Sequence, residues 1–194
     1  MEQRENQRVM LTRRLIKESL VRLLEQESIY KLSVRALCQE AGVNRSTFYK
    51  YYGSPYDVLA ELECDLLGSI QTALDSAPLP DADGEREQFI AICAFLERNA
   101  QLVCLLIRNN ADPEFPERLF RLPQIQTRLR RRLEGCYSEE EGEYAFIFLT
   151  SGCYRLMRDW IMTVPRKPAR EMAVLLLDLI DKICTPRPAV GETH

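Results

Sequence analysis

The sequence of 194 residues predicts an all-α protein, and three observations support this class. Apolar residues recur at helical spacing along the chain, whereas no segment sustains the alternation of apolar and polar residues that marks a half-buried strand. The apolar stretches are separated by breaks that contain proline, glycine or paired asparagines. With 46% hydrophobic and 28% charged residues, the composition is that of an ordinary globular chain.

The first predicted helix extends from about residue 9 to residue 26. One of its faces carries the apolar residues, which are Leu15, Ile16, Leu20, Leu23 and Leu24. We expect this face to pack against the two shorter helices that follow and to complete a three-helix head.

Residues 33–52, SVRALCQEAGVNRSTFYKYY, predict two short helices joined by a tight turn. Ser33 is a residue type that caps a helix by accepting a backbone N–H bond, and apolar residues follow it at helical spacing. Gly42 supplies the left-handed backbone that ends a helix, and Asn44 offers a side-chain oxygen to cap the next one. The second helix, from about residue 45 to residue 52, is expected to bury Phe48 against its partner.

This second short helix carries hydrogen-bond donors, which are Arg45, Ser46, Thr47, Tyr49 and Lys50. Such side chains suit phosphates and base edges, and a helix fits the major groove of DNA with its N-terminal residues nearest the bases. Arg45 and Ser46 are therefore the predicted base-reading residues. The alternative is a tyrosine-rich helix packed inside an all-α domain with its polar side chains solvated, which would leave an exposed aromatic cluster at residues 48–56 without a use.

The motif resembles that of the TetR-type one-component transcriptional regulators. The residues that carry the resemblance are Ala41-Gly42-Val43, Thr47-Phe48-Tyr49 and Tyr51-Tyr52. The resemblance implies phosphate contacts for Thr47, Tyr49 and Tyr51, and a phosphate or base contact for Lys50. Ser33 and Asn44, which open the two short helices, complete the predicted DNA-binding set.

Two positions depart from the family pattern. Tyr52 stands where the family usually has Phe, and Pro55 stands where a phosphate-binding Lys usually opens the next helix. Pro55 still suits a helix start, since Ser54 can cap it and proline is favoured at the first helical position.

Charge is distributed unevenly along the chain. The whole sequence is acidic, with 26 Lys and Arg against 29 Asp and Glu, which by itself would argue against a nucleic-acid partner. Residues 1–55 nonetheless carry a net charge of +4, and residues 56–194 carry −7. Affinity for DNA depends on local cations, so the positive end is predicted to face double-stranded DNA. Its arginines, Arg4, Arg8, Arg13 and Arg14, either serve this end or form a solvated helix face.

Several classes of protein find no support in the sequence. No apolar run reaches the roughly 18 residues that span a bilayer, and the first ten residues lack the apolar core of a signal peptide, so we expect a cytoplasmic location and no membrane partner. Seven cysteines are scattered without a CxxC pair and the one histidine is His194, so no metal site and no cofactor are predicted. No nucleophile with a base and no phosphate-cradling glycine loop indicates an enzyme.

The cysteines lie mostly inside apolar helical runs, and we expect most of them to pack in the core as small hydrophobic residues. The alternative is a thiol sensor, which requires a pKa lowered by nearby positive charge. Cys153 near Arg155 and Cys184 near Lys182 are the candidates for that role.

Further helices are predicted at about residues 54–76, 84–98, 100–108, 113–135, 138–163 and 168–184. The helix that opens at Ser54 and Pro55 links the DNA-binding head, residues 1–53, to a regulatory and dimerisation body, residues 54–194. This helix ends in SAPLPDADG, whose two prolines and one glycine interrupt helical structure.

The resemblance implies an input from a small molecule held among the middle helices, which displaces the linking helix. The residues that could line such a cavity are Phe89, Cys93, Leu96, Leu106, Phe120, Tyr144 and Phe148. Ordinary core packing is the alternative for each of them. The C-terminal pattern from Gly152 to Trp160, followed by Pro168, also loosely resembles regulators of dihydroxyacetone kinase, which implies a partner protein as an alternative input.

The two C-terminal helices are the predicted dimer interface, because the family packs two such helices from each subunit into a four-helix bundle. The residues expected there are Leu149, Gly152, Leu156, Trp160, Ala173, Leu176, Leu177 and Ile180. The alternative is an amphipathic pair that folds onto its own core. A homodimer would hold two heads on a near-palindromic operator.

The sequence therefore predicts a homodimeric DNA-binding transcriptional regulator, a repressor more often than an activator by family habit. Its predicted input is a small molecule or a partner protein. The competing prediction is a helical protein-interaction module that has lost specific DNA binding, for which Pro55 and the acidic total charge are the arguments.

Overall fold

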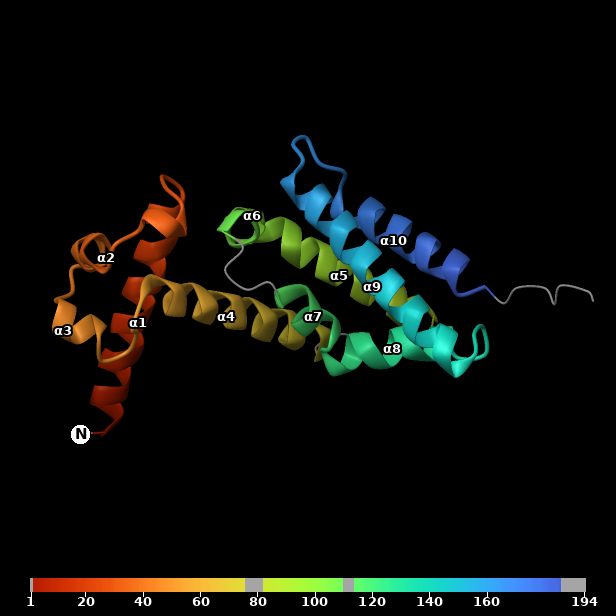
Figure 1. Cartoon of the computed structure of the whole chain (residues 1–194), viewed down its shortest axis with the longest axis horizontal. Helices are drawn as coiled ribbons and strands as arrows, with labels where there is room; N and C mark the ends of the chain where they lie inside the picture. The colour runs from red at the N-terminus through yellow and green to blue at the C-terminus, as the bar shows by residue number, and fades with distance from the viewer. Residues whose placement is uncertain (1, 76–81, 110–113, 186–194) are drawn as a thin grey trace, which may run out of the picture. The chain divides into compact units, whose positions relative to one another are not determined.

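The structure, a computed structural model, describes residues 2–75, 82–109 and 114–185, and within these residues it is built from helices with no strand. The predicted all-α class is confirmed (Figure 1). The helices, in chain order, are α1 (Glu2–Leu24), η1 (Ile29–Lys31), α2 (Val34–Ala41), α3 (Arg45–Phe48), α4 (Pro55–Asp75), α5 (Ala82–Arg98), α6 (Ala100–Asn109), α7 (Phe115–Phe120), α8 (Pro123–Leu133), α9 (Glu139–Met162) and α10 (Ala169–Ile183).

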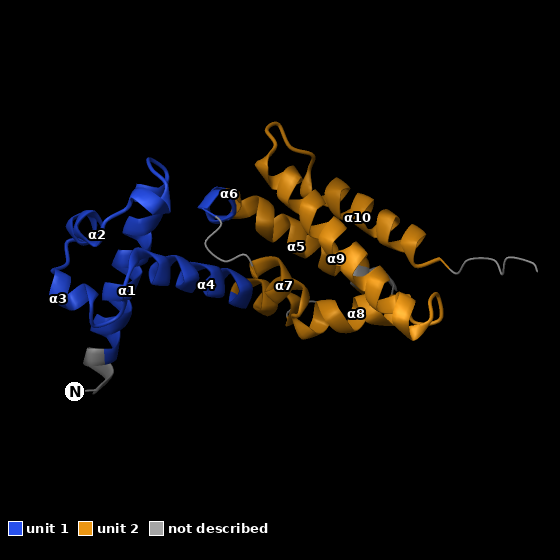
Figure 2. Cartoon of the chain, in the orientation of Figure 1, with its two compact units in different colours: residues 1–68, 101–113 blue, residues 69–100, 114–194 orange. Residues whose placement is uncertain are grey.

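The chain forms two compact units, shown in separate colours in Figure 2. Unit 1 consists of Met1–Gly68 with Gln101–Pro113, and unit 2 consists of Ser69–Ala100 with Glu114–His194. The predicted boundary between residues 53 and 54 lies inside unit 1. The first turns of α4 belong to this unit and bury Val58, Leu59 and Leu62.

Unit 1 has a core to which each of its first helices contributes. α1 packs on α2, and α2 packs on α3. The apolar side chains with 1% exposure or less are Ile16 and Leu20 from α1, Ile29 from η1, Leu37 from α2, Phe48 from α3, and Val58 and Leu59 from α4. The predicted apolar face of α1 is therefore confirmed at Ile16, Leu20 and Leu24, whereas Leu23 is half-buried and Leu15 is exposed.

Asn109, at the end of α6, is a buried polar residue of unit 1. Its side-chain oxygen accepts the backbone N–H of Ile29 at 2.9 Å, and its amide nitrogen donates to the carbonyl of Leu105 at 2.8 Å. Both polar atoms of the side chain are thus satisfied inside the protein, as burial requires. Asn109 thereby fixes η1 to α6.

In unit 2, α10 packs along α5, and α9 contacts α7, α8 and α10. Its most buried side chains include Leu149 and Ile161 on α9 and Leu176 and Ile180 on α10. α9 opens with a capping box, in which the Ser138 side chain and the Glu141 side chain each bond to the other's backbone N–H. At its far end, Trp160 Nε1 donates to the carbonyl of Lys167 at 2.7 Å and holds the connection to α10.

The prediction of one continuous helix over residues 113–135 is wrong, because the segment forms two helices, α7 and α8. Leu122 has ψ near 127° and interrupts it, and Pro123 opens α8. A proline disfavours helical backbone in the residue before it, which accounts for the break between α7 and α8. The predicted interruption at SAPLPDADG falls largely on residues 76–81, which lie outside the described residues, and α5 begins at Ala82.

Over the described part of the chain, no single helix combines the length and apolar character needed to cross a membrane. Two consecutive helical segments, residues 86–98 and 100–109, have the required length and apolar character when taken together, but the chain bends sharply between them.

Candidate nucleic-acid interface and cavity

The turn between α2 and α3 is built by side-chain caps at both helix starts. Ser33 Oγ accepts the backbone N–H of Ala36 at 3.1 Å, and Asn44 Oδ1 accepts that of Thr47 at 2.8 Å. Gly42, which ends α2, has φ of 64° in the left-handed region. A side chain at position 42 would be strained in this conformation whatever the space around it. All three predicted turn roles are confirmed.

α3 is shorter than the predicted helix at residues 45–52, because it ends at Phe48. The chain continues in tight turns, with the N–H of Tyr51 donating to the carbonyl of Phe48 at 2.9 Å. Phe48 is fully buried and Tyr52 is 5% exposed, with ring centroids 5.7 Å apart. These two rings belong to the core, so the predicted burial of Phe48 is confirmed and Tyr52 adds no exposed aromatic surface.

Tyr52 is anchored through a cluster of charged side chains that joins α1 to α4. Its hydroxyl donates to Glu61 Oε2 at 2.8 Å, and Glu61 also pairs with Lys17 at 2.9 Å and Arg13 at 2.5 Å. Lys17 pairs in addition with Asp65 at 2.5 Å. Burial raises the pKa of the Tyr52 hydroxyl, which stays protonated and able to donate. The cluster fixes the chain just after α3 to both flanking helices.

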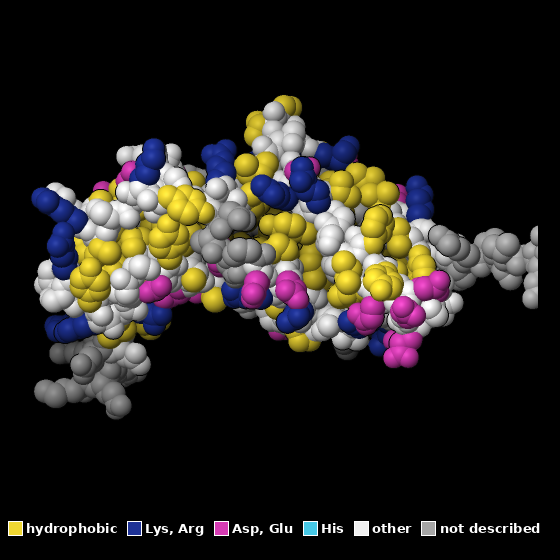
Figure 3. All heavy atoms as spheres, viewed as in Figure 1, with side chains coloured by type: hydrophobic (Ala, Val, Ile, Leu, Met, Phe, Trp, Pro, Cys, Tyr) yellow, Lys and Arg dark blue, Asp and Glu magenta, His cyan; other side chains and the backbone are white. Residues whose placement is uncertain are grey.

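The surface formed by α3 and the turns that follow it, residues 45–51, holds most of the predicted DNA-binding side chains. Arg45, Ser46, Tyr49 and Lys50 are exposed, while Thr47 and Tyr51 are half-buried. Within the described residues, neither Arg45 nor Lys50 forms an ion pair. Figure 3 shows Lys and Arg side chains, in dark blue, gathered over α2 and α3. This surface therefore offers two cations without an ion pair, together with exposed hydroxyl groups, to a polyanion.

The start of α4 carries a carboxylate in place of a cation. Asp57 Oδ2 accepts the backbone N–H groups of Gly53 and Ser54 at 2.7 and 3.1 Å. These amides are satisfied internally, and the carboxylate would repel a phosphate placed here. Asp57 thus gives an electrostatic reason why a phosphate contact is disfavoured at the start of α4.

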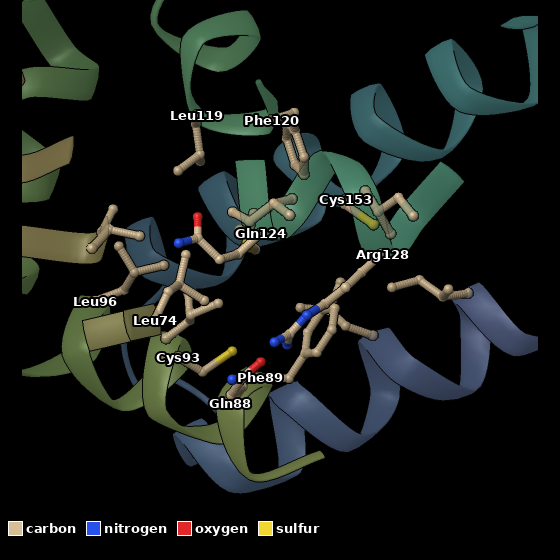
Figure 4. A pocket seen from close by; sticks show the side chains of 17 residues that line it. Leu74, Gln88, Phe89, Cys93, Leu96, Leu119, Phe120, Gln124, Arg128 and Cys153 are labelled. Carbon is tan, nitrogen blue, oxygen red and sulfur yellow. The ribbon is translucent and has the colours of Figure 1, made fainter. Parts of the chain in front are cut away.

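Unit 2 encloses a cavity of about 50 Å³ with apolar walls (Figure 4). Four of the predicted cavity residues, Phe89, Cys93, Leu96 and Phe120, line it. Leu106 is buried in unit 1 instead, and Tyr144 and Phe148 are 68% and 69% exposed, so these three residues do not line this cavity. The last turns of α4 contribute Ile70 and Leu74 to the cavity wall.

Sequence patterns miss the polar side chains of this cavity. Gln88 from α5 and Gln124 and Arg128 from α8 line it. Arg128 lies in the run RLRRRL, whose charges suggest a solvated helix face, and only the position of α8 separates Arg128 from its exposed neighbour Arg131. The helical spacing of the apolar residues in α8 is the one signal that could have singled it out.

Comparison with known families decides the classification. The family described as "Bacterial regulatory proteins, tetR family" matches residues 16–62, and the family described as "Transcriptional regulator C-terminal region" matches residues 85–182. The second match alone covers half of the chain. The chain belongs to the TetR family. The resemblance inferred from the sequence is thereby confirmed.

Solved structures of TetR-type regulators share the fold. A TetR transcriptional regulator from Streptococcus agalactiae 2603V is similar over 93% of this chain and 99% of its own, with a TM-score of 0.73 and 21% identity. The dihydroxyacetone kinase operon activator DhaS has a TM-score of 0.57 at 13% identity, over 88% of this chain and 94% of its own. Thermus thermophilus FadR, a repressor in complex with lauroyl-CoA, has a TM-score of 0.56 at 18% identity, over 94% and 100%. No curated protein matches the chain.

The C-terminal helices of this TetR-family protein expose a different face from the predicted one. Six predicted interface residues have 8% exposure or less and pack inside unit 2: Leu149, Trp160, Ala173, Leu176, Leu177 and Ile180. These side chains pack on the rest of the unit, as the alternative of an amphipathic pair folded onto its own core implies, and they do not form the exposed surface of α9 and α10. Gly152 and Leu156 remain exposed on α9 together with Tyr144, Ile147 and Phe148.

The cysteines of this TetR-family chain are less uniformly buried than predicted. Cys38, Cys93 and Cys153 are buried, whereas Cys64 is exposed. Burial raises the pKa of Cys93 to about 12 and that of Cys153 to about 11. Cys153 is therefore a protonated thiol at neutral pH, which contradicts its candidacy as a sensor with a lowered pKa.

Proposed function

We propose that this TetR-family chain is a homodimeric DNA-binding transcriptional regulator, in the cytoplasm, that reads a near-palindromic operator through α3. The observation that carries the proposal is that the segment of residues 45–52 is anchored in the core on one side and exposed on the other. Phe48 and the Tyr52 cluster hold the helix rigidly in the head, while Arg45, Ser46, Tyr49 and Lys50 stay exposed. A rigid helix with an exposed, cationic polar face suits the major groove.

The side chains of α3 and of the turns that follow it, residues 45–51, have two proposed roles. Arg45 and Ser46 stand in the first turn, which approaches base edges. Ser46 Oγ already donates to Asn44 Oδ1 at 2.8 Å, so its remaining capacity is as an acceptor of a base amino group. Tyr49, Lys50 and the half-buried Thr47 and Tyr51 follow as phosphate contacts, which position the helix without reading sequence.

The exposed apolar face of α9 supports a homodimer. Tyr144, Ile147, Phe148 and Leu156 lie on this face, with Gly152 among them to allow close helix approach. Figure 3 shows hydrophobic side chains, in yellow, exposed over α9. Large exposed apolar patches mark interaction surfaces, and a second copy of the chain would bury this one symmetrically. Phe148→Asp is expected to convert the dimer to a monomer in sedimentation velocity.

The cavity of unit 2 is the proposed site of control, with repression as the default state. α4 contributes Glu61 to the cluster that anchors Tyr52, and Ile70 and Leu74 to the cavity wall. A small molecule that moves the last turns of α4 would therefore act on the helix that also holds the head. A partner protein acting on the body is the alternative input.

Loss of DNA affinity on removal of Tyr49 and Lys50 tests the proposal. Operator fragments are first selected from genomic DNA, and Kd is then measured by gel shift at two salt concentrations. The Tyr49→Ala, Lys50→Ala double variant should bind at least about tenfold more weakly and with a salt slope reduced by about one. Arg131→Ala is the control, since it removes an exposed cation from unit 2.

A second candidate function is a helical interaction module without specific DNA binding. Asp57 at the start of α4 and the acidic total charge favour it. It predicts no enriched fragment and an affinity for DNA that the double variant leaves unchanged. Either result would overturn the proposed regulator.

A further inference from the structure

Arg128 is the one charged side chain among the residues that line the cavity of unit 2. The lining consists of apolar side chains, two cysteines, Gln88, Gln124 and Arg128, with neither Asp nor Glu among them. Arg128 is half-buried, and among the described residues it has no ion pair or hydrogen bond. Figure 4 shows its side chain reaching from α8 toward the wall that α5 forms with Gln88 and Phe89.

A partly desolvated guanidinium without a carboxylate favours an anion. Its five N–H donors form a fixed fork that matches a carboxylate in bidentate fashion. One guanidinium neutralises one negative charge, so a monoanion fits better than a phosphate dianion. Apart from Gln88 and Gln124, the remaining lining residues are apolar or cysteine and suit an apolar group.

The volume limits the apolar part of the occupant. One water-sized group needs about 10–15 Å³ of cavity volume. The cavity of about 50 Å³ therefore has room for about three to five non-hydrogen atoms. A long acyl chain does not fit without opening the helices around it.

From these observations we infer that the cavity binds a short-chain monocarboxylic acid, with its apolar chain in the cavity and its carboxylate on Arg128. This inference rests on the proposed function, because it names the ligand class for the site through which we propose the protein is controlled. Binding would draw α8 toward α5 and wedge against Ile70 and Leu74 of α4, which line the same cavity.

Isothermal titration calorimetry on the full chain tests the head group and the chain length separately. Butyrate, hexanoate and dodecanoate vary the length, and hexan-1-ol, hexylamine and butyl phosphate vary the head group at short length. Hexanoate should bind at least about tenfold more tightly than hexan-1-ol, the gain expected of a charge-assisted hydrogen bond. Hexylamine should not bind, and dodecanoate should gain nothing over hexanoate.

Variants of Arg128 tie the head-group preference to one side chain. Arg128→Gln should weaken hexanoate at least about tenfold and leave hexan-1-ol unchanged, whereas Arg128→Lys should restore part of the affinity. Arg131→Gln removes the same charge from an exposed position of the same helix and should change neither ligand. Far-UV circular dichroism and Trp160 fluorescence verify that each variant is folded.

Several outcomes overturn the inference. These are equal binding of hexan-1-ol and hexanoate, tighter binding of butyl phosphate, tighter binding of dodecanoate, or no binding of any probe. Gel shifts with the selected operator separate this failure from that of the proposed function. Specific DNA binding without binding of any carboxylic acid would contradict the proposed ligand class alone. Arg128-dependent acid binding without specific DNA binding would contradict the proposed regulator alone.

Discussion

Replacing Glu61 by Gln tests how the end of α3 is held in the head. The carboxylate bonds to Tyr52 Oη at 2.8 Å, Lys17 Nζ at 2.9 Å and Arg13 Nη2 at 2.5 Å. Glutamine keeps the shape of the side chain but removes the charge that these three donors share, and its amide nitrogen adds a donor where only acceptors are useful. We expect Glu61→Gln to destabilise unit 1.

The exposure of the partners sets the size of the loss. The side chains of Glu61 and Lys17 are each 19% exposed, and that of Arg13 is 45% exposed. Exposed ion pairs contribute about 0–1 kcal/mol, and breaking a buried pair costs about 3–5 kcal/mol. For a cluster between these limits we expect a loss of about 1–3 kcal/mol in the free energy of unfolding.

The same carboxylate predicts a pH dependence. Burial opposes its charged form, but hydrogen bonds from Lys17, Arg13 and Tyr52 outweigh burial and hold the pKa of Glu61 below its ordinary value. The folded-state pKa is thus lower than the unfolded value of about 4.3. The stabilisation is complete above the unfolded pKa and is lost as the pH falls through the folded one. In the Glu61→Gln variant, the free energy of unfolding should therefore fall less steeply as the pH is lowered through this acid range.

Urea unfolding followed by far-UV circular dichroism measures the loss, and fluorescence of the single tryptophan, Trp160, reports on unit 2 separately. Glu18→Gln is the matched control. Its ion pair with Arg14 at 2.9 Å joins two largely exposed side chains and should contribute only about 0.3–0.5 kcal/mol. The reasoning would be refuted if Glu61→Gln were as stable as Glu18→Gln. It would also be refuted if the stability of Glu61→Gln fell at acid pH as steeply as that of the unmodified protein.

Three further predictions concern single side chains. Asn44→Ala removes the cap of α3 and should cost about 1 kcal/mol in urea unfolding and weaken operator binding, while Asn44→Ser should recover most of both, and an equal loss in the two variants would contradict the capping role. Phe48→Ala empties a fully buried position and should cost about 3–5 kcal/mol in thermal or urea unfolding, and a cost near that of a surface change would show that this ring is not part of the core. Burial raises the pKa of Cys153 to about 11, so iodoacetamide at neutral pH should modify exposed Cys64 far faster, and similar rates in mass spectrometry would contradict this.

Helix ends are predictable from the sequence where they depend on contacts within a few residues. Ser33, Gly42 and Asn44 have their expected roles because a cap is made with the backbone three or four positions away. At Leu122 the local rule and the longer pattern disagree. Apolar spacing continues across Pro123 and predicts one helix, but the constraint that proline places on Leu122 prevails.

The face that each helix buries is harder to predict, because α9 is apolar on two sides. Leu149 and Trp160 pack inward and Tyr144 and Phe148 point outward, and the sequence offers both sets at helical spacing. The choice depends on the positions of α8 and α10, which no local pattern encodes. The same reason hides Arg128, whose value to the cavity arises from placement rather than from residue type.

The make-up of unit 1 has a consequence for hybrid regulators. A transplant of residues 1–53 would leave behind Val58 and Leu59, which fill the core of the transplanted part, and Glu61, which anchors it. The transferable piece extends through Gly68, and its host must also supply the returning stretch of α6, where Asn109 accepts the amide of Ile29. Exchanging DNA specificity between such proteins is therefore a problem of matching two separate segments, and a mismatch at position 109 would appear as poor folding before it appeared as a change of operator.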